Sequence, residues 1–192
     1  MRKLLSIIFL GLSSIGFAQS EIGTRFQIYP AGYITTAQFV LGTGEKSAWI
    51  FELGYNTANR KDFGEHDNEE GGGFGLGAGY RRYFKEGMKG FYVEANLETW
   101  FLEIDWSEPF DSSVLDIICD PGPCVFLPDT GITNITVLQP TLGIGYQFRF
   151  RSEKWGATIG ATFGREWNVK TKGEEVGQGG ISLLNFSVTR RL

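Results

Sequence analysis

Hydrophobic and polar residues alternate with a period of two along most of the chain, and the alternation is clearest in its last third. From residue 138, one face carries Leu138, Pro140, Leu142, Ile144, Tyr146, Phe148 and Phe150. The opposite face carries Gln139, Thr141, Gly143, Gly145, Gln147, Arg149 and Arg151. Successive side chains of a β-strand point to opposite faces, so this period predicts strands and not helices.

The same period predicts eight strands. Their approximate ranges are 22–29, 33–41, 47–57, 73–84, 90–106, 133–150, 155–170 and 178–192. One alternative stays open near the start of the chain. A single bent strand across Pro30, Ala31 and Gly32 would leave seven strands, one short of an even number.

The two faces of these strands favour a membrane barrel over a soluble sheet. The polar faces are rich in Gly, Thr, Asn and Gln, whereas a face in water usually carries many Lys and Glu. The apolar faces carry aromatic residues near their ends, such as Trp155 and Trp167 on one strand and Tyr146 to Phe150 on another. Aromatic residues in these places form the interfacial girdles of membrane barrels.

Short turns alternate with longer polar connections along the chain. The short ones are residues 43–46, 85–89 and 151–154, and the long ones are 58–72, 107–132 and 171–177. Outer-membrane barrels have short periplasmic turns, long outer loops and both termini in the periplasm. Six of the seven connections fit, and only 30–32 is short where a long loop is expected. We therefore predict an all-β fold, an antiparallel up-and-down transmembrane β-barrel, closed because an open sheet edge cannot face lipid.

The first 18 residues have the pattern of a secretory signal peptide. Arg2 and Lys3 precede an apolar run over 4–12, and Gly16-Phe17-Ala18 forms a small-x-small cleavage signal. The run is too short for a membrane-spanning helix and lacks the amphipathic spacing of a buried one. No Cys lies near the cleavage point, which argues against a lipoprotein anchor. We predict a signal peptide over 1–18 and a single domain over 19–192.

Composition and charge agree with an exported barrel. The chain has 27 Gly, 16 Phe, 7 Tyr and 5 Trp, yet no apolar segment after the signal is long enough for a transmembrane helix. Removing the signal lowers Lys plus Arg from 18 to 16 against 22 acidic residues, a net charge of about −6. Nothing in this charge balance resembles the basic stripe of a nucleic-acid-binding protein.

The segments GFAQS, GGGFGLGAGYRRYF, PTLGIGYQFRF and LLNFSVTRRL resemble the small outer-membrane β-barrel families of the OmpA-transmembrane-domain and OmpX type. The resemblance covers nearly all of the mature chain and rests on pattern. It implies outer-membrane lipid and, during biogenesis, the barrel-assembly machinery as partners. Such proteins usually end in an aromatic residue with another two positions before it, whereas this chain has Leu192 and Arg190 there.

Two glycine-containing motifs are interpreted as structural. The run from Gly71 to Gly79 has dinucleotide-like spacing but no helix opening within it. Its period instead places Gly73, Gly75, Gly77 and Gly79 on one face, where they leave room for large side chains from across a narrow lumen. Asp129-Thr130-Gly131 is like the aspartic-protease triplet, but that chemistry needs two carboxylates, so we predict a turn.

His66 is the only histidine, and four acidic residues lie near it: Glu65, Asp67, Glu69 and Glu70. We expect a solvated loop here. Weak binding of a divalent cation by the clustered carboxylates is the alternative, without the spacing of an EF-hand. No catalytic residue, metal-ligand set or cofactor is assigned.

Cys119 and Cys124 frame the sequence Asp-Pro-Gly-Pro. Export to an oxidising compartment predicts a disulfide between them. The spacing is not the C-x-x-C of redox proteins, and further metal ligands are missing.

Charged residues at inferred inward positions form the last candidate set. They are Arg25, Glu52, Arg81, Glu94, Glu98, Arg149, Glu166 and Arg191. The interior of an eight-stranded barrel is only wide enough for side chains to fill it. Buried ions must pair, so the mixed signs predict a plugged, salt-bridged lumen.

These inferences lead to an integral protein of the cell outer membrane with a structural or surface-contact role, and not an enzyme. Its functional surface would be the loops at 107–132 and 58–72. A lipid-modifying barrel enzyme and a soluble, lipocalin-like exported binding barrel are the two alternatives. The extracellular partner stays unknown.

Overall fold

The computed structural model describes residues 19–61, 64–108 and 129–192, which form antiparallel strands joined by turns and loops. The strands are β1 (Ser20–Tyr29), β2 (Gly32–Gly44), β3 (Ser47–Asn59), β4 (Asn68–Lys85), β5 (Lys89–Glu108), β6 (Asp129–Arg149), β7 (Trp155–Arg165), β8 (Trp167–Lys172) and β9 (Gly180–Arg191). Within these residues, no helix is long and apolar enough to cross a membrane.

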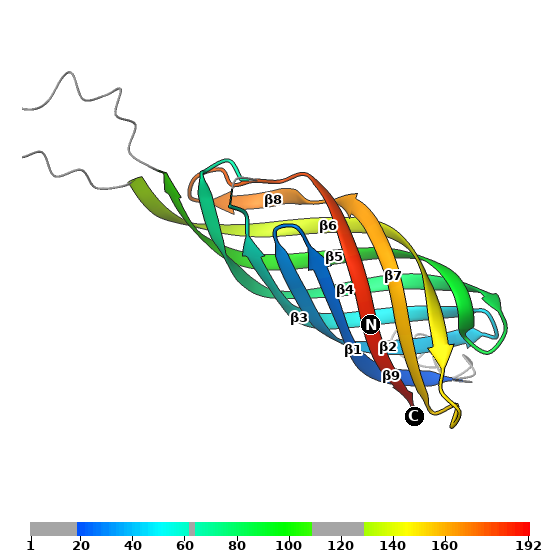
Figure 1. The fold of residues 1–192 in the computed structure, drawn as a ribbon. Helices are drawn as coiled ribbons and strands as arrows, with labels where there is room; N and C mark the ends of the chain where they lie inside the picture. Colours follow the sequence, from blue (N-terminus) through cyan, green and yellow to red (C-terminus); the bar gives the residue numbers. More distant parts are fainter. Residues whose placement is uncertain (1–18, 62–63, 109–128) are drawn as a thin grey trace, which may run out of the picture.

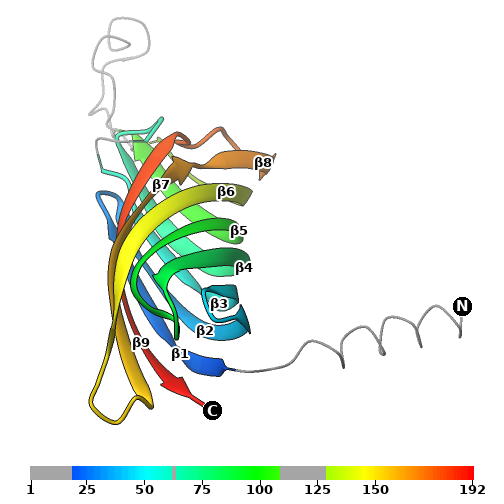
Figure 2. The same cartoon turned by 90° about the vertical axis from the view of Figure 1, so that its right-hand side faces the viewer.

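The strands form a closed ring, shown from two sides in Figures 1 and 2. Each of β1 to β5 pairs with its neighbour in sequence, β1 also pairs with β9, β9 with β7, and β7 with β6. Pairing of β5 with β6 closes the ring. β7 and β8 flank Glu166 and both pair with β6, so they are two parts of one bent strand. The ring therefore has eight strand positions, called staves below, and β7 and β8 together occupy one of them.

The predicted all-β, up-and-down architecture is confirmed. β1 and β2 are separate strands joined at Pro30 and Ala31, so the seven-strand alternative is wrong. β3 and β4 run further toward the loop end than predicted, because their pairing continues to Asn59 and Glu70. The signal peptide predicted over 1–18 lies outside the described residues, and that prediction stays untested.

The barrel has two unlike ends. At the end that we call the terminal end, the Leu192 amide donates to the Ser20 carbonyl at 3.0 Å, and short turns connect β2 to β3, β4 to β5 and β6 to β7. The opposite end, the loop end, has the connections over 60–67 and 173–179 and the short turn at Pro30. β5 and β6 are the longest strands and extend beyond their neighbours at the loop end (Figure 1).

The outward face of the ring is apolar. Large hydrophobic side chains stand exposed on every stave, among them Phe26, Phe39, Leu53, Phe74, Leu97, Leu142, Phe163 and Phe186. On β6, Leu142 is 69 % exposed and its neighbour Thr141 only 4 %. The predicted alternation of faces is thus confirmed, with the apolar side chains outside and the polar ones inside.

The glycine run lies on the inward side of β4 and accommodates side chains of the adjacent strand β5. A Cβ added at Gly75 would lie 2.2 Å from Trp100 Cε3, and one at Gly79 would lie 2.0 Å from Asn96 Oδ1. At Gly77 the nearest atom, 2.8 Å away, belongs to Glu98. The expectation that these glycines leave room for side chains from across the lumen was therefore wrong about the origin of the side chains. They come from the neighbouring strand.

A Gly75→Ala substitution is expected to lower the free energy of unfolding by about 1–3 kcal/mol, because the added methyl would overlap the Trp100 ring in a filled interior. The matched control is Gly179→Ala, where nothing lies within 4 Å of the added carbon. Urea titration of both variants in lipid vesicles measures the difference. Equal stability of the two would contradict the close packing of Trp100 against β4.

Candidate functional site

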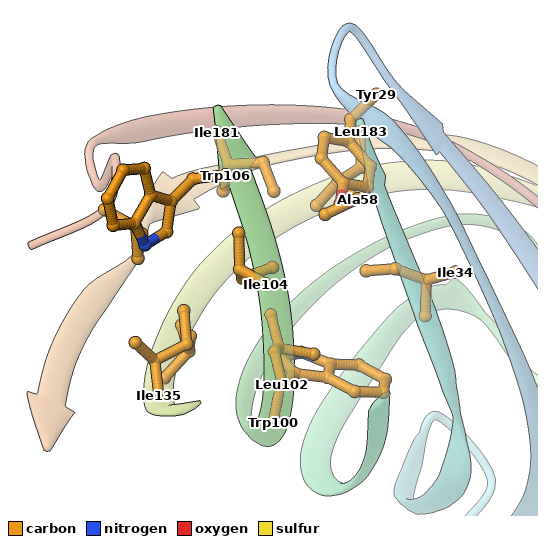
Figure 3. Close-up of a cluster of buried hydrophobic side chains, with 12 residues drawn as sticks. Tyr29, Ile34, Ala58, Trp100, Leu102, Ile104, Trp106, Ile135, Ile181 and Leu183 are labelled. Atoms are coloured by element: carbon orange, nitrogen blue, oxygen red, sulfur yellow. The ribbon is translucent and has the colours of Figure 1, made fainter. Parts of the chain in front are cut away.

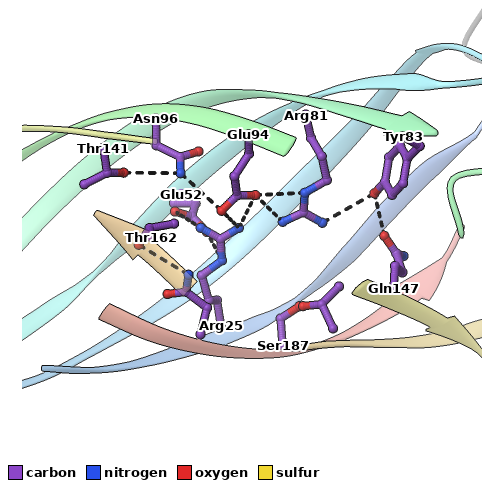
Figure 4. Close-up of polar contacts among 12 residues, drawn as sticks. Arg25, Glu52, Arg81, Tyr83, Glu94, Asn96, Thr141, Gln147, Thr162 and Ser187 are labelled. Atoms are coloured by element: carbon purple, nitrogen blue, oxygen red, sulfur yellow. Dashed lines mark hydrogen bonds and ion pairs between the residues drawn. The ribbon is translucent and has the colours of Figure 1, made fainter. Parts of the chain in front are cut away.

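Four buried charges from four staves meet inside the barrel, and we call Arg25, Glu52, Arg81 and Glu94 the charged cluster (Figure 4). Arg81 Nη2 lies 2.7 Å and Arg25 Nη2 3.1 Å from Glu94 Oε2. Arg25 Nε lies 3.3 Å from Glu52 Oε1. Glu94 therefore joins both arginines, and Arg25 links it to the second carboxylate.

Neighbouring side chains complete the polar contacts of the charged cluster. Asn96 donates to Glu94 at 3.3 Å, and the Thr36 hydroxyl donates to Glu52 at 3.4 Å. The Arg81 guanidinium lies 4.1 Å from the centre of the Tyr92 ring. Buried ions are tolerated only when they are paired and hydrogen-bonded, and this set meets both conditions for Glu94.

Glu98 lies in the same part of the lumen without an ion pair to any described residue. The Gln139 amide donates to its Oε2 at 3.2 Å, while Oε1 has no hydrogen-bond partner, and the side chain is 1 % exposed. Two arginines thus face three carboxylates, Glu52, Glu94 and Glu98. This layer of the lumen, formed by Arg25, Arg81 and the three carboxylates, therefore contains one more carboxylate than arginine.

The turn between β4 and β5 folds over the lumen at the terminal end. Met88, which has a φ of 51°, is fully buried. Arg149 pairs with Glu21 and donates to the Met88 carbonyl at 3.1 Å, while Arg191 Nη2 donates to the Gly87 carbonyl at 2.8 Å. These contacts fasten the turn across the end of the barrel.

The loop-end half of the lumen is apolar, which the sequence analysis did not predict. A buried cluster, called here the apolar cluster, fills it with side chains from several staves (Figure 3). Its members are Tyr29, Ile34, Ala58, Trp100, Leu102, Ile104, Trp106, Ile135, Val137, Val176, Ile181 and Leu183. The expectation of a lumen filled throughout by ion pairs holds only for the terminal half. On β5 the alternation reverses here, because Leu102, Ile104 and Trp106 face inward while Glu103 and Asp105 face outward, so the expectation of polar inward residues fails.

A second set of ion pairs lies at the loop end, next to the apolar cluster. We call Arg60, Glu69 and Glu166 the rim cluster. Arg60 Nη1 lies 3.6 Å from Glu69 Oε2, and Arg60 Nη2 lies 3.3 Å from Glu166 Oε2. Arg60 also donates to the Gly177 carbonyl, and the Gly177 amide donates to Glu69 at 3.1 Å. The rim cluster therefore ties the connection between β8 and β9 to that between β3 and β4.

His66 is buried at the loop end, so the expectation of a solvated loop was wrong for this residue. Its ring stacks on Trp106 with 4.2 Å between centroids. Nδ1 lies 2.8 Å from Glu108 Oε1, and Nε2 lies 3.0 Å from the Glu175 carbonyl. Both partners are acceptors, so both ring nitrogens donate only in the imidazolium form. Burial alone would lower the pKa of His66, but these hydrogen bonds outweigh it and raise the pKa above its usual value.

This raised pKa predicts a pH-dependent loop end. Because the folded pKa is higher than the unfolded one, the stabilisation is complete below about pH 6.5 and is lost as the pH rises through the folded pKa. Hydrogen exchange of the Gly177 amide should therefore be slower at pH 6 than at pH 9, after correction for intrinsic rates. His66→Gln should remove the difference, and Asp67→Asn, a change at an exposed neighbour, should keep it. A pH dependence that survives in His66→Gln would contradict this assignment.

Asp129-Thr130-Gly131 is strand and not the predicted turn. These residues begin β6 and pair with Trp106, Ser107 and Glu108. A Cβ at Gly131 would lie 2.4 Å from the Trp106 ring, so this glycine leaves room for the indole that supports His66. Within the described ranges, no three Asp, Glu, His or Cys side chains gather in a way that could hold a metal ion.

The structure separates the eight predicted lumen charges into three places. Arg25, Glu52, Arg81, Glu94 and Glu98 lie in the middle of the barrel, Arg149 and Arg191 at the terminal end, and Glu166 in the rim cluster. Sequence reasoning missed Glu21 and Arg60, and it placed Glu69 and His66 in a solvated loop. Glu21 and Glu69 share the inward parity of Arg25 and Gly71, which would have indicated them. Cys119 and Cys124 lie outside the described residues, and their disulfide stays a prediction.

Comparison with known proteins gives similarity of structure alone. No family model and no curated protein matches the sequence. The N-terminal β-barrel domain of Pseudomonas aeruginosa OprF is 13 % identical with a TM-score of 0.45, over 91 % of this chain and 97 % of that one. The chain is similar in fold to small outer-membrane barrels.

Two further solved structures are similar in the same way. The attachment invasion locus protein Ail of Yersinia pestis, solved with the heparin analogue sucrose octasulfate, is 9 % identical with a TM-score of 0.48, over 91 % and 97 % of the two chains. Neisserial surface protein A is 7 % identical with a TM-score of 0.48, over 91 % and 96 %.

Proposed function

We propose that this chain is an integral outer-membrane protein, closed to solutes, whose loop end is its contact-making surface. The observation that carries the proposal is the inverted arrangement of the barrel. Ion pairs are buried inside, while Leu142 and Ile144 stand 69 % and 63 % exposed outside. Soluble monomers rarely expose a continuous apolar surface of this kind. A soluble lipocalin-like barrel would place its apolar residues inside around a ligand.

The height of the outward apolar band supports a membrane location. On β4, the outward side chains run from Phe84 to Phe74, a rise of about 33 Å along the strand. A strand tilt of about 40° reduces this rise to about 25 Å, the height of the apolar band of an outer-membrane barrel. Beyond Phe101 on β5, the outward residues become Glu103 and Asp105, as expected where lipid ends.

The two unlike ends of the barrel support an orientation in the membrane. Short turns, the start of β1 and the C-terminus share the terminal end, which we assign to the periplasm, and the longer connections share the loop end, which we assign to the cell surface. Barrel-assembly machinery and outer-membrane lipid are then the partners during biogenesis. Heat-modifiable gel migration of the outer-membrane fraction tests the location. Recovery of the protein as a soluble periplasmic species would overturn it.

A closed lumen predicts the absence of stable conductance. The charged cluster fills the middle of the barrel, Met88 covers one end, and the apolar cluster occupies the half toward the other end. Planar-bilayer recording of the purified protein should show no stable single-channel currents. Large, long-lived openings would contradict a plugged barrel.

The second candidate function, a lipid-modifying enzyme, rests on one observation. His66 is held by the Glu108 carboxylate at the end of β5, as a catalytic histidine would be by its orienting group. The Nε2 atom is bonded to the Glu175 carbonyl, however, and a general base needs a free nitrogen. Comparing outer-membrane lipids of a His66→Ala strain with the parent tests this candidate. A lipid modification that depends on His66 would favour the enzyme.

A further inference from the structure

A groove crosses the outward face of the barrel over four staves. It has a volume of about 690 Å³, and its lining is almost wholly apolar. Val93 and Ala95 of β5 form its floor, and it is lined on the two sides by Tyr80 and Arg82 of β4 and by Leu142, Ile144 and Phe163 of β6 and β7. We call it the Arg82 groove.

Strand register explains the shape of the groove. Tyr80, Ala95 and Leu142 form one row across β4, β5 and β6, and Arg82, Val93 and Ile144 form the next. Ala95 is thus flanked on both sides by larger side chains, and the surface is lowest there. The two walls are two strand spacings apart, about 9.6 Å. An alkyl chain, whose carbons contact neighbours at about 4 Å, fits between them.

Arg82 gives the groove a charged end. Its side chain faces outward between those of Tyr80 and Phe84. Phe84 is the last outward aromatic residue of β4 at the terminal end, and Arg82 lies two residues further from that end. It takes part in no ion pair between described residues. A long arginine near the edge of the hydrocarbon directs its guanidinium toward the headgroups. There a phosphate matches its paired N–H donors.

We propose that the Arg82 groove binds one phospholipid of the periplasm-facing leaflet. The lipid phosphate pairs with Arg82, and one acyl chain lies over Ala95 between Tyr80 and Leu142. Phosphate charge and chain shape are then recognised together, so neither inorganic phosphate nor an uncharged diacyl lipid satisfies the site. The inference rests on the membrane orientation proposed above.

The test is native mass spectrometry of the mature barrel released from vesicles that contain phosphatidylglycerol and diacylglycerol. The parent should retain one phosphatidylglycerol and no diacylglycerol, and added inorganic phosphate should not displace the lipid. Arg82→Gln should weaken retention about tenfold, since it removes a charge-assisted hydrogen bond. Ala95→Leu should weaken it by filling the floor of the groove.

Two matched variants separate this site from general lipid adsorption. Arg190→Gln removes another outward arginine near the terminal end, whose guanidinium lies 5.9 Å from the Trp155 ring. Ala37→Leu enlarges an outward alanine of β2. Both should retain lipid as the parent does. Equal losses in Arg190→Gln and Arg82→Gln, parental retention by Ala95→Leu, or displacement by inorganic phosphate would overturn the site.

Heat-modifiable migration of every variant shows whether the barrel has folded. Failure of the parent chain itself to fold in bilayers would overturn the membrane proposal together with the groove. Normal folding without selective lipid retention would overturn the groove alone.

Discussion

Replacing Glu94 with Gln is expected to lower the free energy of unfolding by about 3–5 kcal/mol, the largest effect of a single substitution that we predict. Glu94 accepts ion pairs from both Arg25 and Arg81, and all three side chains are almost fully buried. Loss of its charge leaves Arg25 paired with Glu52 but leaves Arg81 without an ion pair to any described residue. Removing one partner of a buried ion pair is costly because the other charges stay uncompensated. Urea titration in lipid vesicles measures the change.

Glu98→Gln is the matched control for Glu94→Gln. It makes the same chemical change on the same strand, at the second inward position from Glu94 toward the loop end. Glu98 has no ion pair to a described residue, and its layer already carries one more carboxylate than its arginines match. We expect Glu98→Gln to leave the free energy of unfolding unchanged or to raise it. If the two variants were equally destabilised, the charged cluster would not be the source of the stability.

Ile144→Arg is expected to lower the free energy of unfolding in vesicles by about 2–4 kcal/mol, because it places a charge on the lipid face three outward positions inside Phe150, whereas Arg82 lies only one outward position inside Phe84. Ile144 is 63 % exposed and lies in the second row of the Arg82 groove. The cost arises from desolvation of the guanidinium in hydrocarbon.

Asn134→Arg is the control, on the same strand and the same face. Asn134 pairs with Glu103, beyond the aromatic end of the band, where a charge should cost about 0–1 kcal/mol. The prediction is the difference between the two positions. Similar stabilities for both variants would show that depth along β6 does not matter and that Ile144 does not face lipid.

The barrel architecture was predictable because alternation and turn spacing are local signals. Leu142 and Thr141 already differ in the sequence as they do in the structure, and the ring follows once open edges are excluded. Arg81 and Glu94 could be placed inside by parity alone. Their pairing was not specified by parity, because it depends on the register between β4 and β5, in which they lie opposite each other.

The loop end was predicted poorly for an equally physical reason. His66 and Arg60 belong to a charged segment that has no periodic pattern. They become ordered by contacts distant in sequence, such as His66 with Glu108 and Arg60 with Glu166. The apolar cluster was missed because the inward residues of β5 change from polar to apolar at Trp100, while the outward residues change from Phe101 to the charged Glu103 and Asp105. A period-two pattern separates the two faces of a strand, but it does not show that the inward face changes from polar to apolar part-way along the strand.

The most direct test of a lipid-facing barrel is the accessibility of single spin labels along β5 in vesicles. Labels at successive positions from 91 to 101 would be placed in a Cys119→Ser, Cys124→Ser background and exposed to oxygen and to a water-soluble nickel complex. Odd positions, from Phe91 to Phe101, should be accessible to oxygen and not to nickel, with a maximum near Ala95 and Leu97. Even positions such as Glu94 and Glu98 should be accessible to neither. Nickel access at the odd positions, or no alternation at all, would contradict the account.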